Sequence, residues 1–166
     1  HTVKELEDLP MVNTKVAATV PETDYSFIPR KHRRSMSRMG LYAYCAAQEA
    51  LRHAGYETAP EKLGFFMGST LNSISVWMEL AGYSQGAHLE LIKTSDFLQI
   101  MNHSPLAAVC QALKINGPAM GGSEACATGL MNIGLGYMSI RQGLVEQAIC
   151  GGTEEYHPIF TGCFSI

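Results

Sequence analysis

Residues 117–143 constrain this chain most, because they place a cysteine between a run of small residues and a helical pattern. Gly121, Gly122 and Ser123 come shortly before Cys126. After the cysteine, apolar residues recur at intervals of three and four, the period of an α-helix: Leu130, Ile133, Tyr137 and Ile140. The sequence therefore predicts a tight turn that presents Cys126 at or near the N-terminus of a helix.

This position bears on the chemistry of the thiol. Unpaired N–H groups and the macrodipole at a helix N-terminus favour an anion, and the thiolate is the nucleophilic form of cysteine, whose ordinary pKa is about 8.5. The helix start therefore favours a nucleophilic Cys126. The alternative is a small buried cysteine that only packs. A carboxylate at Glu124 would oppose the thiolate if it faced the sulfur.

Several motifs stand in the order and spacing of a known enzyme family. They are GP at 117–118, ACATG at 125–129 and GGTE at 151–154. Together they resemble the nucleophile region of the β-ketoacyl-acyl carrier protein synthases, the condensing enzymes of fatty acid and polyketide synthesis. The resemblance implies an α/β protein with a thiolase-like fold, layered αβαβα. Residues 1–166 would form mainly the N-terminal half of the ketosynthase domain, without its start and its C-terminal half.

The resemblance also implies an activity. In this family a cysteine, here Cys126, holds an acyl group as a thioester, which is condensed with malonyl-acyl carrier protein as CO2 is lost. Two histidines that assist this step lie in family stretches that do not occur in this sequence, so we expect the segment alone to be inactive. The resemblance implies no cofactor and no metal. It does imply that the protein is a homodimer. Two alternatives stay open: a thiolase-type coenzyme A acyltransferase, and a non-catalytic acyl-binding partner subunit.

The family suggests two further functional sites. The basic run RKHRR at residues 30–34 is either an ordinary solvated surface or an anion-docking patch. Family members contact the acidic carrier protein with basic residues at the positions of Lys31 and Arg34. Ile100 stands where the family limits acyl-chain length, although its spacing is equally that of a core isoleucine.

The rest of the pattern alternates helices and strands, as in an α/β protein. Glu154 and Glu155 followed by His157 invite an acid–base or metal interpretation, but adjacent glutamates diverge in an extended chain, so we expect a structural turn. The predicted elements are a short helix at 1–9, a strand at 15–20, a helix at 36–54 ended by Gly55, a buried strand at 63–68, helices at 76–80, 94–101 and 104–113, and a strand at 147–150.

Composition narrows the possible partners and compartment. The formal net charge of -3 gives no general case for binding nucleic acid. Five cysteines without a CxxC pair fit reduced thiols in the cytoplasm better than a disulfide framework. No apolar run is long enough to span a membrane. Only 16% of residues are charged, which indicates that much of the surface is covered by a partner.

Overall fold

The computed structural model describes residues 3–5, 13 and 16–164. The chain divides into two compact units. A terminal unit combines residues 1–27 with 156–166, and a central unit contains residues 28–155.

The terminal unit contains a short antiparallel ribbon and a helix. Strand β1 (Val3–Glu5) pairs with β2 (Val16–Ala18), and helix α7 spans Pro158–Cys163. The predicted strand at 15–20 is confirmed by β2. The predicted helix at 1–9 is wrong where the structure describes it, because residues 3–5 are extended. A helix this short is only marginally stable by itself, whereas the ladder to β2 pairs the backbone groups of residues 3–5.

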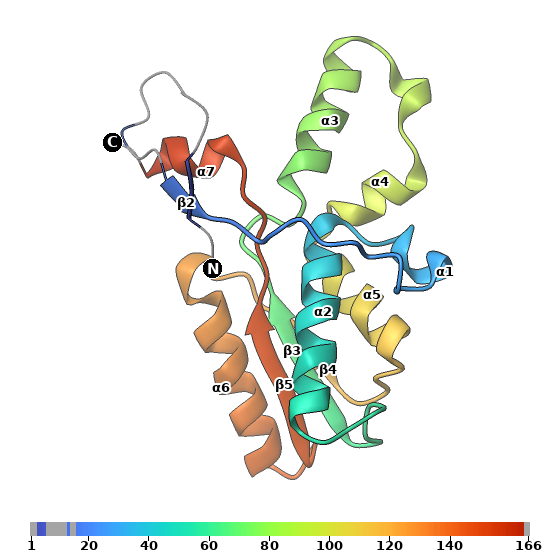
Figure 1. Cartoon of the computed structure of the whole chain (residues 1–166), viewed down its shortest axis with the longest axis vertical. Helices are drawn as coiled ribbons and strands as arrows, with labels where there is room; N and C mark the ends of the chain where they lie inside the picture. The colour runs from blue at the N-terminus through green and yellow to red at the C-terminus, as the bar shows by residue number, and fades with distance from the viewer. Residues whose placement is uncertain (1–2, 6–12, 14–15, 165–166) are drawn as a thin grey trace. The chain divides into compact units, whose positions relative to one another are not determined.

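The central unit is built on a parallel sheet in the order β4-β3-β5 (Figure 1). These strands are β3 (Leu63–Gly68), β4 (Ala119–Met120) and β5 (Gln147–Gly152). All of β3 is buried, as expected for the middle strand of a sheet covered on both faces. The predicted strands at 63–68 and 147–150 are therefore confirmed. The two residues of β4 carry too short a pattern to be predicted as a strand.

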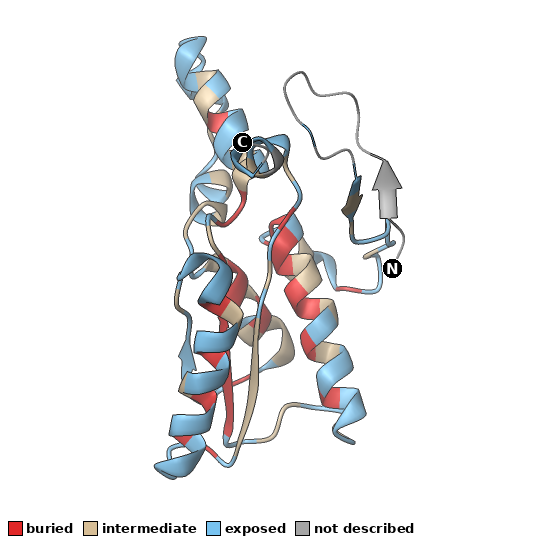
Figure 2. Ribbon diagram, turned by 90° about the vertical axis from the view of Figure 1, so that its left-hand side faces the viewer, coloured by how far each residue is buried: buried red, intermediate tan, exposed pale blue. Residues whose placement is uncertain are grey.

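Two helices cover one face of this sheet. They are α2 (Arg38–His53) and α5 (Ser104–Leu113). The Ser37 side chain caps α2 by accepting a hydrogen bond from the Gly40 N–H at 3.3 Å. Beyond α2, Gly55 has φ +82°, a conformation that favours glycine and ends the helix as predicted. Figure 2 shows the buried stripe along α2, which includes Met39, Ala43, Ala47 and Leu51.

Helix α6 (Thr128–Arg141) covers the opposite face of the sheet. It lies close to the strands because Gly136 has no side chain: a Cβ there would overlap Cys150 Sγ and lie 3.3 Å from Ala148 Cβ. The outward face of α6 is apolar yet exposed, with Leu130 74% accessible (Figure 2). The exposed apolar residues of α6 also include Ile133, Tyr137, Met138 and Ile140. The central unit is thus a helix–sheet–helix sandwich with one uncovered apolar face, and the predicted α/β class is confirmed.

Further helices complete the central unit on the right-hand side of Figure 1. They are α1 (Arg30–Arg33), α3 (Ile74–Gln85), the 3₁₀ turn η1 (Leu89–Leu91) and α4 (Thr94–Gln99). The predicted helices at 76–80 and 94–101 are confirmed by α3 and α4, with different ends. Within the described part of the chain, we find no helix of the length and apolar character needed to cross a membrane.

Candidate active site at the N-terminus of α6

Cys126 lies in an exposed turn between the sheet and α6. It is the middle residue of the 3₁₀ turn η2 (Ala125–Ala127), which follows β4 and leads directly into α6 at Thr128. The N-cap of α6, Ala127, makes no side-chain capping hydrogen bond. The predicted turn before a helix is therefore confirmed. The thiol is accessible to a reactant beside the start of a 14-residue helix, a setting that favours an anion.

The backbone just before Cys126 is in an uncommon conformation. Ala125 has φ +48°, in the left-handed region that non-glycine residues rarely adopt. Such a residue costs on the order of 1 kcal/mol or more, so the surrounding structure must hold it in place. The contacts that hold the turn are therefore part of the site.

A buried asparagine of α6 holds one side of the turn. Asn132 is 0% exposed and accepts a hydrogen bond from the Gly122 N–H at 3.4 Å. Its amide nitrogen donates to the Gly151 carbonyl at the end of β5, at 3.1 Å. One side chain thus links the glycines that precede Cys126 to the neighbouring strand. Sequence analysis did not single out this residue, because a lone asparagine within an apolar helical pattern carries no motif.

Two further hydrogen bonds fix the next residues of the turn. The Ser123 hydroxyl donates to the Thr70 carbonyl at 2.9 Å, and the Glu124 N–H donates to the Thr128 hydroxyl at 2.8 Å. The direction of the Glu124 side chain is also defined. Its carboxylate folds back over Gly122, where a Cβ would lie 2.5 Å from Oε2 and 2.8 Å from Oε1. The carboxylate therefore lies on the Gly122 side of the turn.

The two adjacent glutamates after β5 bind backbone groups. Glu154 Oε2 accepts from the Thr70 N–H at 2.9 Å, and Glu155 Oε1 accepts from the Ser75 N–H at 2.7 Å. Glu154 thereby holds the loop after β3, and Glu155, which is 3% exposed, holds the first turn of α3. These contacts agree with the structural role that we expected for this turn. Among the described residues, no group of three or more His, Cys, Asp or Glu side chains could hold a metal ion.

Ile100 is half-buried immediately after α4. Asn72, from the loop after β3, donates its amide nitrogen to the carbonyls of both neighbours of Ile100, Gln99 at 2.7 Å and Met101. Asn72 is fully buried and has φ +57°, a conformation that asparagine tolerates better than most residues. The position of Ile100 is thus set by a residue that sequence analysis did not single out.

Lys31 and Arg34 are both exposed, at the short helix α1 and just after it. Four consecutive basic residues form α1, and none of them is buried. The structure thus presents a local positive surface on a chain of net charge -3. Anions can be attracted to such a patch although the whole chain is acidic.

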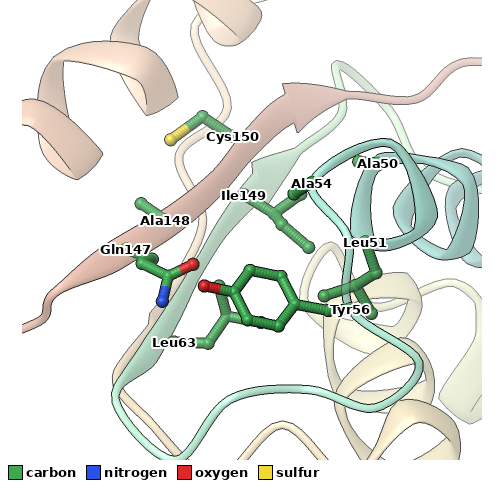
Figure 3. Close-up of a pocket in the computed structure, with 9 residues that line it drawn as sticks. All are labelled: Ala50, Leu51, Ala54, Tyr56, Leu63, Gln147, Ala148, Ile149 and Cys150. Carbon is green, nitrogen blue, oxygen red and sulfur yellow. The ribbon is translucent and has the colours of Figure 1, made fainter.

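A pocket of about 230 Å³ lies elsewhere, between the end of α2 and the edge strand β5 (Figure 3). Figure 3 shows Ile149 and Gln147 pointing to the side of Tyr56, while Cys150 points to the opposite face. The pocket is lined by Ala50, Leu51, Ala54, Tyr56, Leu63 and residues 147–150. Cys126 instead follows the carboxyl end of β4. The pocket is therefore not part of the site around Cys126.

The other cysteines differ from Cys126 in their surroundings. Cys126 and Cys163 are exposed, whereas the other three are partly buried. Burial raises the pKa of the Cys110 thiol to about 11 and also raises the pKa of Cys45 and of Cys150. A raised pKa lowers the thiolate fraction near neutral pH. In the central unit, Cys126 is thus the exposed thiol next to a helix N-terminus.

Comparisons of the chain with known proteins agree on one family. The family profile described as "Beta-ketoacyl synthase, N-terminal domain" matches residues 8–165. The chain is 29% identical over 137 residues to 3-oxoacyl-[acyl-carrier-protein] synthase 2 of Staphylococcus aureus, covering 76% of this chain and 32% of the relative. It is 28% identical over 132 residues to the ketoacyl synthase alpha subunit of the tetracenomycin polyketide synthase of Streptomyces glaucescens, covering 74% and 31%.

The fold matches solved structures as well. A β-ketoacyl synthase from Burkholderia phymatum superposes with a TM-score of 0.83 at 26% identity, over 98% of this chain and 42% of that one. The predicted thiolase-like fold, represented by its N-terminal portion, is therefore confirmed. The chain spans about a third of the length of the curated relatives it matches.

Proposed function

Because the chain belongs to the β-ketoacyl synthase family, whose N-terminal domain matches residues 8–165, we propose that the protein condenses an acyl group held on Cys126 with a malonyl unit on an acyl carrier protein. One observation carries this proposal: Cys126 occupies an exposed, strained turn at the start of α6 in a chain of this family. The names of two relatives support the same class of reaction, since one is a ketoacyl synthase subunit of a polyketide synthase and the other a 3-oxoacyl-[acyl-carrier-protein] synthase.

The chemistry consists of two transfers. In the first, the Cys126 thiolate attacks the carbonyl carbon of an acyl thioester. A new C–S bond to Cys126 forms, the C–S bond to the donor breaks, and the donor leaves as its thiolate. In the second, the malonyl thioester loses CO2, and its carbanion attacks the acyl carbon. A C–C bond then forms while the C–S bond to Cys126 breaks, which returns the thiolate and releases a 3-oxoacyl thioester.

We propose that the catalytic groups for the second transfer correspond to the part of the relatives' sequences that these 166 residues do not match. In the family, two histidines assist decarboxylation. A second hydrogen-bond donor of the oxyanion hole helps to stabilise the oxyanion of the tetrahedral intermediate. Losing one such donor typically costs about a hundredfold or more in rate. We therefore expect the 166-residue chain by itself to take up acyl groups poorly and not to condense them.

Acylation of Cys126 is tested by mass spectrometry of the natural polypeptide, by which we mean the protein at its natural length. The protein is first incubated with an acylated carrier protein or with acyl-coenzyme A. We expect a single acyl adduct on Cys126, lost in Cys126→Ala and kept in the matched control Cys163→Ala. Faster transfer from the carrier supports the proposal, and faster transfer from coenzyme A favours the thiolase-type alternative. Absence of an adduct from both donors would refute catalysis at Cys126 and leave the acyl-binding partner subunit.

Lys31 and Arg34 are proposed to bind the carrier protein, and Ile100 to contact the acyl chain. Support for the first comes from the exposure of both side chains in a basic segment. The name of one relative, 3-oxoacyl-[acyl-carrier-protein] synthase 2, also refers to an acyl carrier protein. Support for the second comes from the half-buried position of Ile100 at the end of α4. A cytoplasmic location remains a prediction from the odd number of cysteines.

The protein is also proposed to be a homodimer. The exposed apolar side chains of α6 and of the edge strand β4 support burial against further parts of the protein and a second copy. Sedimentation of the natural polypeptide tests this, with a dimer as the expected species. A monomer at all concentrations would refute it.

A further inference from the structure

Three segments distant in sequence converge on the turn that presents Cys126. At the end of β5, Glu154 accepts a hydrogen bond from the Thr70 N–H at 2.9 Å, across 84 residues of sequence. Thr70 in turn accepts a hydrogen bond at 2.9 Å from the Ser123 hydroxyl, across 53 residues. Ser123 lies three positions before Cys126 in the sequence. A continuous series of hydrogen bonds thus runs from a carboxylate to the segment that carries the thiol.

We propose that Glu154 is a positioning residue for Cys126, acting through Thr70 and Ser123. This inference rests on the proposed function, because it concerns the thiol that would accept the acyl group. Glu154 does not itself contact the reacting atoms in this account. It holds Thr70 so that the Thr70 carbonyl meets the Ser123 hydroxyl, and Ser123 then holds the start of the cysteine turn.

The turn needs such an external hold for two reasons. Gly121 and Gly122 have no side chains with which to anchor the segment. Ala125 is kept in the left-handed region, which the local sequence does not favour. A hydrogen bond from a backbone N–H to a carboxylate is stronger than one to a neutral acceptor, so Glu154 suits the task.

Acyl transfer is sensitive to the position of the nucleophile. Transfer is fast only when the sulfur and the carbonyl carbon are held within about 3–3.5 Å in the correct direction, and a displacement of about 1 Å can reduce the rate a hundredfold. Loss of either hydrogen bond should therefore slow acylation without unfolding the protein, because Thr70 and Ser123 lie at the accessible end of the sheet.

The experiment uses the natural polypeptide and hexanoyl N-acetylcysteamine thioester, a small donor that does not depend on carrier docking. The rate of acylation at Cys126 is measured by mass spectrometry in Glu154→Ala, Glu154→Gln, Ser123→Ala and the double variant Glu154→Ala/Ser123→Ala. Iodoacetamide labelling of the exposed Cys163 in the same molecules serves as an internal control. Glu57→Ala, at an exposed glutamate, is the matched control variant.

We expect Glu154→Ala to acylate about tenfold more slowly and Ser123→Ala about three- to tenfold more slowly, in line with the loss of one hydrogen bond. The double variant should be no slower than the slower single variant, because both act in one series. Glu154→Gln keeps an acceptor oxygen for the Thr70 N–H and should lie within about threefold of the wild type. Labelling of Cys163 should not change.

Different results would refute the proposed function and the positioning role of Glu154. A wild-type protein whose Cys126 takes up no acyl group would refute the proposed function. A wild type that is acylated, with Glu154→Ala equally fast, would refute the positioning role alone. Glu154→Gln as slow as Glu154→Ala, or multiplied effects in the double variant, would also refute it. Should Glu154→Ala not fold, Ser123→Ala decides, and an unchanged rate there ends the proposal.

Discussion

Replacing Gly136 by alanine tests the close contact between α6 and the sheet, on which the position of the cysteine turn depends. The added Cβ would overlap Cys150 Sγ and would lie 3.3 Å from Ala148 Cβ and 3.4 Å from Phe66 Cδ2. Overpacking of this kind typically costs about 1–3 kcal/mol. Alanine recovers up to about 1 kcal/mol of helix propensity. We therefore expect Gly136→Ala to reduce the free energy of unfolding by about 1–2 kcal/mol.

The clash is tested by removing the sulfur. Because Cys150→Ala deletes the atom that the new methyl group would overlap, Gly136→Ala should cost less in the Cys150→Ala background than in the wild type. Urea unfolding of the natural polypeptide, followed by circular dichroism, gives the four free energies of this cycle. We expect a favourable coupling of about 1 kcal/mol or more, within the range for residues in contact. Additive effects, or a stabilising Gly136→Ala, would show that α6 does not lie on β5 as described.

Two further predictions concern the proposed sites, and a third concerns the partly buried Cys110. Changing both Lys31 and Arg34 to glutamate should weaken the binding of an acidic carrier protein and reduce the salt dependence of that binding. If a binding titration at low salt gave the double variant the same affinity as the wild type, the docking role would be contradicted. Ile100→Phe should shorten the longest acyl chain accepted, because a close-packed site has no space for a ring. An unchanged profile of product lengths would show that Ile100 is an ordinary core residue. Partial burial raises the pKa of the Cys110 thiol to about 11. The stability that comes from its neutral form is therefore present below the ordinary pKa of a thiol and is lost as pH rises through about 11. In a pH series of iodoacetamide labelling, Cys110 should accordingly react more slowly than Cys126 until that range, and equal rates at pH 8 would contradict its burial.

The sequence by itself determined the elements with a long or clearly bounded pattern. Strand β3 was predicted because its short apolar run is bounded by glycines, and α6 because its apolar residues keep a helical period after a glycine-rich turn. The placement of Cys126 before a helix followed from the same local pattern. Family membership could also be predicted, since several short motifs occur in the right order. These features depend on residues near one another in the chain.

Only the tertiary structure decided what holds the site in place. Asn132 and Asn72 carry no motif, and Glu154, although it ends the GGTE motif, was expected only to form a structural turn. Each of the three acts through a hydrogen bond to a backbone group of another segment of the chain. Strand β4 exists because two residues complete a ladder with β3, and the strand at residues 3–5 exists because it pairs with β2. Such pairings depend on which segments meet in space. A local pattern indicates which backbone groups need partners, and the fold decides where those partners come from.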